Sequence, residues 1–215
     1  MSKKKSITPL KNGPFLLKEV DRLIDSTGKT FSSDKESIIL CRCGQSNNKP
    51  FCDGTHAKKG WQDTNTPPQK PRKTVDYQGK DITIHDTPRV CAKVGYCTAG
   101  SPKVFESGRN PWIEPDAEPA EKVVETIRKC PSGALAYTVG GVFHDEYSSD
   151  TPEVEILKNG PLCVRGSIEL ESSEKPVSTE HYTLCRCGQS NNKPFCDSAH
   201  LKVGFKDEGI IKKKS

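Results

Sequence analysis

The sequence predicts an α+β protein made of three small modules that are rich in short strands and loops. Three observations lead to this prediction. A stretch of thirteen residues occurs twice in the 215-residue chain, so part of the fold is repeated. The chain has ten cysteines but only 32% hydrophobic residues, which indicates that metal or redox chemistry supplements a small core. Between the two copies lies an unrelated segment with both a strand-like and a helix-like pattern.

The repeated stretch is long and nearly unchanged. Residues 41–53 read CRCGQSNNKPFCD, and the same thirteen letters return at 185–197. Upstream, the stretch Lys11–Leu16 is echoed by Lys158–Cys163, which extends each copy toward its N-terminus. Each copy is therefore a unit of about fifty residues rather than an isolated motif.

These boundaries divide the chain into three parts. We expect a first repeat at 9–64, a middle module at 72–148 and a second repeat at 152–209. Two polar stretches that contain proline, 65–71 and 147–152, have the composition of surface linkers.

Each repeat carries three cysteines and one histidine in the spacing Cys-x-Cys-x8-Cys-x3-His. The first set is Cys41, Cys43, Cys52 and His56, and the second set is Cys185, Cys187, Cys196 and His200. Thiolates suit iron–sulfur clusters, Zn²⁺ or Cu(I). Zinc loops usually separate paired cysteines by two to four residues, so the Cys-x-Cys pair favours a cluster and leaves structural zinc as the alternative.

The residues beside these ligands predict a tight metal-binding loop. Gly44 and Gly188 relieve steric limits directly after each Cys-x-Cys pair. Asp53 and Asp197 are expected to cap a short helix that carries the histidine, because aspartate is favoured at helix N-caps.

The repeats resemble the CDGSH iron–sulfur family, to which mitoNEET belongs. Its pattern, C-x-C-x2-[ST]-x3-P-x-C-D-G-[SAT]-H, is matched in full by 41–56, whereas the second copy has Ser198 in place of the glycine. The resemblance implies a β-rich fold and one [2Fe–2S] cluster per repeat, with two cysteines on one iron and cysteine plus histidine on the other. If the glycine position needs a positive φ, Ser198 is strained.

The middle module has its own three cysteines, Cys91, Cys97 and Cys130. Bacterial ferredoxins bind a cluster through C-x2-C-x2-C and a distant Cys-Pro. Here Val94 stands in place of the central cysteine, and Cys130 precedes Pro131. Three thiolates suit a [3Fe–4S] cluster. A [4Fe–4S] cluster with a non-cysteine fourth ligand, or three buried structural cysteines, are the alternatives.

Local patterns around these cysteines fit a small α+β unit. Asp81–His85 alternates like a strand, and Ala120–Lys129 has the apolar stripe of a helix. Pro119 suits the first turn of this helix, and Pro131 ends it.

The middle module resembles the divergent mono-cluster ferredoxin-like family over about residues 75 to 145. The recurring motifs are Arg89–Cys91, Pro102–Phe105, Pro111–Ile113 and Cys130–Leu135. The resemblance implies an α+β ferredoxin-like fold. Many members carry a histidine two residues after the first cysteine, but Lys93 occupies that place here and excludes such a ligand.

Four further residues match no motif position. Cys163 lies opposite Leu16 in the repeat alignment, so we expect it in the core. A fourth ligand for the middle cluster and a reactive thiol are its alternatives. His85, His144 and His181 are expected on the surface or in hydrogen bonds.

Composition argues against several function classes. The net charge of +5 comes from six lysines at Lys3–Lys5 and Lys212–Lys214, which leaves −1 on the rest of the chain and predicts no nucleic-acid partner. The chain has neither an apolar run long enough for a membrane span nor a secretory h-region, so a cytoplasmic location is expected. With no catalytic motif apparent, we expect no enzyme activity.

The expected function is a multi-cluster one-electron carrier between a reductase and an acceptor. The alternative is a protein that transfers [2Fe–2S] clusters to apo-acceptors or senses redox state, and a third is a zinc-stabilised interaction module. Because CDGSH proteins with one motif generally dimerise, we expect a monomer whose two repeats pair as a pseudo-dimer. We also expect a largely unfolded apo-protein.

Overall fold

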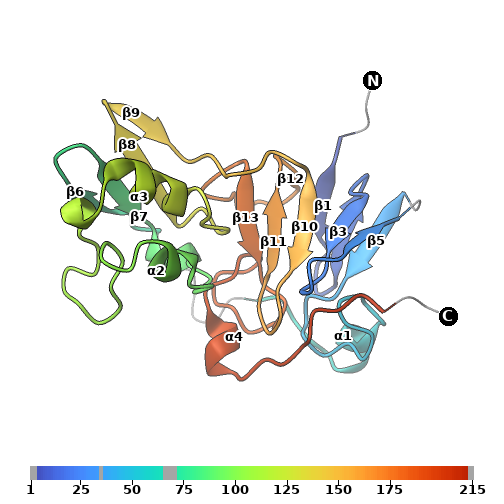
Figure 1. The fold of residues 1–215 in the computed structure, drawn as a ribbon. Helices are drawn as coiled ribbons and strands as arrows, with labels where there is room; N and C mark the ends of the chain where they lie inside the picture. The colour runs from blue at the N-terminus through green and yellow to red at the C-terminus, as the bar shows by residue number, and fades with distance from the viewer. Residues whose placement is uncertain (1–3, 34–35, 65–71, 213–215) are drawn as a thin grey trace.

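The computed structural model describes residues 4–33, 36–64 and 72–212, and shows a mixed α+β protein with three small sheets (Figure 1). The expected linker at 65–71 lies outside the described residues. Helices are few and short in the described parts, and the longest has eight residues. In these parts we find no helix with the length and apolar character needed to cross a membrane.

Two sheets contain the strands of the repeats. Sheet A has the order β12-β1-β2-β5, and sheet B has the order β13-β11-β10-β3-β4. The strands of the first repeat are β1 (Ser6–Pro9), β2 (Phe15–Lys18), β3 (Arg22–Ile24), β4 (Thr30–Ser32) and β5 (Ser37–Leu40). Those of the second are β10 (Glu153–Ile156), β11 (Leu162–Arg165), β12 (Glu169–Leu170) and β13 (His181–Leu184).

The two repeats exchange a strand. β3 of the first repeat pairs in parallel with β10 of the second, where Leu23 lies opposite Val154. Reciprocally, β12 of the second repeat pairs in parallel with β1 of the first, where Ile7 lies opposite Leu170. Each sheet is therefore completed by the other repeat.

The core between the two sheets draws on both repeats. Strands with one buried face alternate inward and outward, as in β5, where Ile38 and Leu40 are buried while Ser37 and Ile39 are exposed. The buried residues from the first repeat include Ile7, Phe15, Leu17, Leu23, Ile38 and Leu40, and those from the second include Val154, Ile156, Leu162, Val164, Tyr182 and Leu184.

The middle module forms a third sheet covered by short helices. The sheet has the order β6-β7-β8-β9, with β6 at Val75–Gln78, β7 at Thr83–Asp86, β8 at Leu135–Val139 and β9 at Val142–His144. Its helices are α2 (Tyr96–Gly100), α3 (Ala120–Ile127) and two 3₁₀ turns at Pro88–Val90 and Pro115–Ala117.

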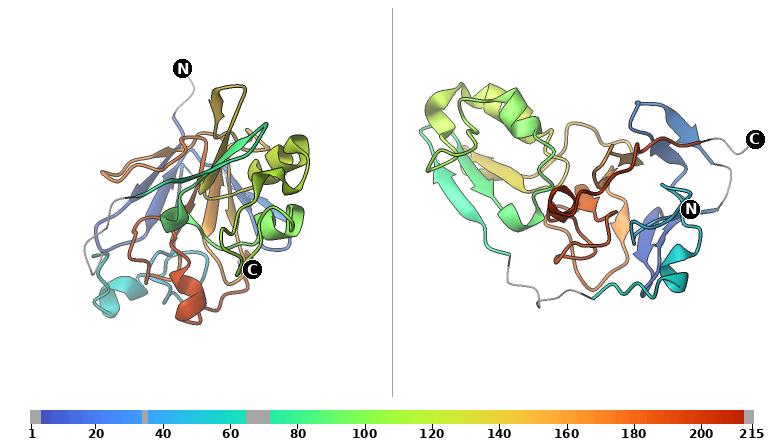
Figure 2. Two further views of the ribbon diagram at one scale, coloured as in Figure 1. Left: turned by 90° about the vertical axis from the view of Figure 1, so that its left-hand side faces the viewer. Right: turned by 90° about the horizontal axis from the view of Figure 1, so that it is seen from below.

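The expected strand and helix of this module are present with shifted ends. The strand expected at Asp81–His85 begins at Thr83, because a turn brings the Gly79 amide to the Ile82 carbonyl at 2.9 Å. The expected helix ends at Ile127 instead of Lys129, and Val123 and Ile127 are buried against the sheet. The middle module lies beside β13, the edge strand of sheet B (Figure 2).

Two one-turn helices carry the expected histidine ligands. α1 spans Thr55–Lys58 in the first repeat, and α4 spans Ala199–Lys202 in the second. Both lie at the same end of the two sheets (Figure 1). The repeats therefore present their metal-binding loops on one side of the molecule.

Candidate metal centres

The paired cysteines of each repeat lie at the separation that one metal ion requires. Cys41 Sγ and Cys43 Sγ are 3.7 Å apart, and Cys185 Sγ and Cys187 Sγ are 3.6 Å apart. Two thiolates bound tetrahedrally at about 2.3 Å from a metal ion are separated by about 3.7 Å. Each Cys-x-Cys pair thus fits a single metal ion.

The third cysteine and the histidine form a second pair in each repeat. Cys52 Sγ lies 3.4 Å from His56 Nδ1, and Cys196 Sγ lies 3.5 Å from His200 Nδ1. The cysteine of each pair precedes the one-turn helix, and the left-handed residue between them, Gly54 or Ser198, turns the chain so that cysteine and histidine come together. Nδ1 is therefore the nitrogen that faces the cysteine.

The four donors of a repeat are arranged as two pairs. Across the described residues, no group of three or more histidine, cysteine or acidic side chains converges on one ion position. A mononuclear zinc site with three cysteines and one histidine needs all four donors around a single point. Two pairs, each able to hold one ion, fit a cluster with two iron atoms.

Side-chain hydrogen bonds shape the loop between the pairs. Ser46 Oγ donates to the Phe51 carbonyl at 2.7 Å, and Asp53 accepts from the amides of Asn47 at 2.8 Å and Thr55 at 3.0 Å. The second repeat has the same bonds at Ser190, Asp197, Asn191 and Ala199. The aspartates therefore lie one residue before the N-cap rather than at it, because Gly54 and Ser198 occupy that position.

The substituted glycine lies at a position with left-handed backbone. Gly54 has φ 82°, and Ser198 keeps this conformation with φ 66°. A side chain in this region is strained, so the expectation of strain at Ser198 is confirmed. The amide of each residue still donates to a ligand sulfur at 3.4 Å, from Gly54 to Cys52 and from Ser198 to Cys196.

Hydrogen bonds prepare one thiol of each Cys-x-Cys pair to lose its proton. The bond from the Cys43 thiol lowers the pKa of Cys41 to about 6, and the bond from the Cys187 thiol lowers the pKa of Cys185 to about 7. The same bonds raise the pKa of Cys43 and of Cys187. Metals bind thiolates. In each pair, one cysteine is therefore already a thiolate to a large extent near neutral pH, and the other loses its proton when the metal binds.

The two Cys-x-Cys turns pack back to back. A Cβ atom placed on Gly44 would lie 2.7 Å from the Cys187 carbonyl oxygen, and one placed on Gly188 would lie 2.5 Å from that of Cys43. Trp61 Nε1 donates to the Gly188 carbonyl at 3.3 Å and seals this contact. Glycine is required here by the close approach of the other repeat as well as by its positive φ.

The three cysteines of the middle module surround one cavity. Cys91 follows the first 3₁₀ turn, Cys97 lies in α2 and Cys130 follows α3, and all three line a cavity of about 470 Å³. Burial raises the pKa of Cys91, and it raises the pKa of Cys97 to about 11. The wall of the cavity is completed by Asp86, Val94, Tyr96, Trp112, Pro131 and Leu135, among others.

The comparisons with known proteins agree with this geometry. The family model described as an iron-binding zinc finger of CDGSH type matches residues 12–57 and 159–201. The chain belongs to the CDGSH iron-binding family. Between its two CDGSH regions, a model described as a divergent 4Fe–4S mono-cluster matches residues 77–140.

Relatives among curated proteins match a smaller part of the chain. The uncharacterized protein YjdI of Escherichia coli, from strain K12 and from strain O157:H7, is 41% identical over 61 residues. This match covers 28% of the CDGSH protein described here and 80% of YjdI. No solved structure matches the chain.

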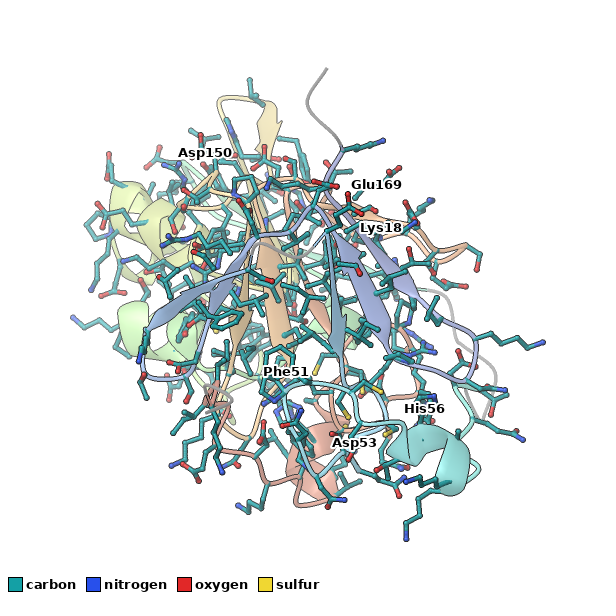
Figure 3. The ribbon with its side chains drawn as sticks, turned by 90° about the vertical axis from the view of Figure 1, so that its right-hand side faces the viewer. Lys18, Phe51, Asp53, His56, Asp150 and Glu169 are labelled. Atoms are coloured by element: carbon teal, nitrogen blue, oxygen red, sulfur yellow. The ribbon has the colours of Figure 1, made fainter. Side chains whose placement is uncertain are left out.

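The two CDGSH sites differ in exposure. Cys52 and His56 of the first repeat are partly exposed, whereas Cys196 and His200 of the second repeat are only 3% and 7% exposed. In the view of Figure 3, His56 lies on α1 at the edge of the molecule. The two closely similar motifs thus form one site that is partly open to solution and one site that is enclosed.

Sequence reasoning did not identify the arginine inside each Cys-x-Cys pair. Arg42 is 3% exposed and donates to the Gly13 carbonyl at 2.8 Å and to Asp63 at 2.5 Å. Arg186 donates equivalently to the carbonyl of Gly160 and to Asp207. The signal was present in the sequence, because this arginine and an aspartate 21 residues later occur in both repeats.

The remaining cysteine lies apart from the middle site. Cys163 lies in β11 and is 1% exposed, and it is not among the residues that line the cavity of the three cysteines. Lys93, which replaces the histidine common among related domains, is exposed at the rim of the same cavity. The cavity therefore brings three cysteines together, and its lining includes two buried side chains with oxygen atoms, Asp86 and Ser132.

Proposed function

We propose that this protein is a one-electron carrier with two [2Fe–2S] clusters and one cluster of the 4Fe–4S type in its middle module. A cluster of this kind gains or loses one electron without forming a bond to a substrate. The observation that carries the proposal is that the three sets of donor residues adjoin one another in a row. The row runs from the middle module through the second repeat to the first.

The contact between the two CDGSH sites is direct. Gly44 and Gly188 bring the backbones of the two ligand loops together. The charged groups also reach across, since Arg42 interacts electrostatically with Cys185, and Arg186 with Cys41. A negative charge added to the ligands of one site is therefore attracted by the buried arginine of the other repeat.

The contact between the second repeat and the middle module is equally close. Arg89 Nε donates to Asn192 Oδ1 at 3.3 Å, and the Asn192 side chain donates to the Arg89 carbonyl at 3.3 Å. Arg89 lies two residues before Cys91, and Asn192 lies within the CDGSH loop. Burial raises the pKa of Cys196, and the charges of Cys185 and Cys91 raise it further, so ligands of the two sites interact.

The residues at each site determine the order of the reduction potentials of the three clusters. Neutral imidazole in place of a thiolate makes a site less negative and raises its reduction potential, as in Rieske centres. Amides that donate to ligand sulfurs, such as those of Gln45 and Gly54 at 3.4 Å, act in the same direction. We therefore expect electrons to move from the all-cysteine middle site toward the CDGSH sites.

The test is stopped-flow reduction and reoxidation of anaerobically purified protein with iron counted before and after. A carrier cycles reversibly and keeps about eight iron atoms per chain, or about seven if the middle cluster is [3Fe–4S]. EPR on the reduced and oxidised states assigns the middle cluster to one of these types. A colourless protein with stoichiometric zinc would contradict the proposal and support the zinc-stabilised interaction module.

Cluster transfer is the second candidate, and the exposure of the first site favours it. Cys52 and His56 are partly open to solution, so an apo-acceptor could reach the iron they hold. Incubation with an apo-ferredoxin separates the two candidates. Cluster that appears on the acceptor at the rate at which it leaves the first repeat supports transfer, and retention of all iron supports the carrier.

The partners and assembly follow from the same proposal. We propose a reductase and an acceptor as partners and a monomeric chain, because each CDGSH repeat already has the other as its partner through the exchanged strands. A sedimenting mass of about 47 kDa, twice the 23.7 kDa of one chain, would contradict the monomer. We also propose a cytoplasmic location, which is supported by ten cysteines that form no disulfide, as is usual in reducing compartments.

A further inference from the structure

The two CDGSH repeats carry the same outer sheet face, covered in one repeat and uncovered in the other. The registers show the equivalence, because Leu16 of β2 pairs with Ile39 of β5 as Cys163 of β11 pairs with Thr183 of β13. Both β5 and β13 are edge strands. On sheet B this face is closed, with Cys163 1% and Thr183 2% exposed, whereas on sheet A Ile39 is 44% exposed and Leu16 is partly buried.

The middle module covers the face on sheet B and lies beside β13 (Figure 1). The ring of Tyr147 lies 5.1 Å from the guanidinium carbon of Arg165, and the Tyr147 amide donates to Glu180 at 3.4 Å. At the ligand loop, Arg89 Nε donates to Asn192 Oδ1 at 3.3 Å, and the Asn192 side chain donates to the Arg89 carbonyl at 3.3 Å. A cation, a carboxylate and an amide of the second repeat therefore hold the middle module.

The first repeat has the same three kinds of polar group at the equivalent places. Lys18 of β2, opposite Ser37 of β5, takes the place of Arg165. Glu36 and Asn48 take the places of the carboxylate and of the amide in the repeat alignment. Lys18, Glu36 and Asn48 are all exposed. The groups that hold the middle module are thus present a second time, on a face that the middle module does not cover.

The centre of this face is apolar, and the face lies on the side of the open metal site. Leu16 and Ile39 lie at its centre between the polar groups. An apolar centre with a polar rim is the usual composition of a surface that binds another protein. Figure 3 views the side of the molecule opposite the middle module, and Lys18 and His56 both appear there. A protein bound to this face would therefore lie near the first CDGSH site.

We propose that the outer face of sheet A, formed by Leu16, Lys18, Glu36, Ile39 and Asn48, is a docking surface for a small [4Fe–4S] ferredoxin. The ferredoxin binds there as the middle module binds to sheet B, with an aromatic ring against Lys18 and a polar turn against Asn48. The inference rests on the proposed carrier function, because it names the class of external redox partner and the site that this partner approaches.

The identity of the occupant follows from the second repeat. There, the equivalent face binds a module of the divergent 4Fe–4S mono-cluster type through the equivalent polar groups. A second copy of this chain fits less well, because Arg89 and Tyr147 of each copy are already bound to the second repeat of the same chain. A separate ferredoxin has no such internal partner and leaves the middle module in place.

The experiment measures binding and does not depend on electron flow. The full chain is titrated with a bacterial ferredoxin that has a single [4Fe–4S] cluster, and isothermal titration calorimetry gives the Kd. We expect Lys18→Glu and Asn48→Ala each to raise the Kd by about tenfold, because each removes a group of the polar rim. Carbodiimide cross-linking and mass spectrometry then locate the contact, and we expect cross-links from Lys18 or Glu36 to the ferredoxin.

The matched control is Lys202→Glu, which reverses the charge of an exposed lysine on α4 of the other repeat. It should leave the Kd unchanged. The docking surface is contradicted if the wild-type chain does not bind the ferredoxin, or if Lys202→Glu weakens binding as much as Lys18→Glu, since only net charge would then matter. A doubled mass of the chain alone that Lys18→Glu abolishes would assign the face to a second copy and also overturn the proposal.

The carrier proposal fails in a different way. If the wild-type protein loses iron on each redox cycle, or if its clusters cannot be reduced, the carrier function is refuted even when the ferredoxin binds. A wild-type protein that cycles reversibly but does not bind the ferredoxin through this face refutes the docking surface alone.

Discussion

Gly44 and Gly54 share a left-handed backbone but differ in what surrounds them. Their φ angles are 77° and 82°. A Cβ atom at Gly44 would lie 2.7 Å from backbone of the other repeat, whereas one at Gly54 would meet nothing within 4 Å. We expect Gly54→Ala to cost about 1 kcal/mol from backbone strain alone. Gly44→Ala should cost about 2 kcal/mol more, because the backbones must move apart.

Urea unfolding of the iron-loaded variants, followed by circular dichroism, measures this difference. Gly54→Ala is the control that carries the strain without the clash. Equal losses in the two variants would mean that the repeats can separate freely at this contact.

Asp86 is a buried carboxyl group whose titration affects stability. It is 3% exposed and accepts one hydrogen bond from Trp112 Nε1 at 3.1 Å. Burial raises the pKa of Asp86 to about 6, against an ordinary value of 3.8. The folded state therefore binds more protons than the unfolded state between these values, and the stability this group contributes is lost as the pH rises through about 6.

Asp86→Asn removes this titration and keeps an oxygen for Trp112. We expect the variant to gain stability relative to wild type as the pH rises from about 5 to 8. Thermal unfolding at both pH values checks the sign. A stability difference between variant and wild type that stays constant with pH would show that Asp86 is not protonated in the folded protein.

At the scale of elements, the exchanged strand β3 lies within the core of both repeats. Leu23 is fully buried and pairs with Val154 of the second repeat. We expect Leu23→Ala to lower the free energy of unfolding by about 2–4 kcal/mol. Ile39→Ala, which shortens a side chain that is 44% exposed, should cost less than about 1 kcal/mol. Chemical denaturation of both variants provides the comparison, and similar losses would argue against the exchange.

Local patterns predicted some elements but not how the strands pair. The stripe of Val123, Val124 and Ile127 predicted α3. The cysteine and histidine spacing predicted eleven ligands, which stay a prediction. The short helix α2 escaped notice, because five residues that end in glycine show no helical period. The parallel pairing of β3 with β10 joins residues about 130 positions apart, and no local pattern encodes such a contact.

At the scale of the whole molecule, the two kinds of core depend differently on iron. The core of sheets A and B contains no ligand cysteine. In the middle module, Cys130 belongs to the core, and Cys91 and Cys97 pack against it. We therefore expect only the middle module and the ligand loops to unfold in the apo-protein, rather than most of the chain.

Hydrogen exchange after anaerobic chelation tests this difference. We expect amides of β2 and β11 to stay protected and those of α3 and β8 to lose protection when iron is removed. Loss of protection in all four elements would restore the broader expectation drawn from composition.

The exchange of strands within one chain has a consequence for how the two sites evolve. In a dimer of identical subunits, every substitution appears at both metal centres at once. When the two halves are covalently joined, each half is encoded separately and is free to diverge. Gly54 and Ser198 stand at equivalent positions of the two repeats and differ in this way. Joining the halves therefore permits the two centres to differ in sequence and in surroundings.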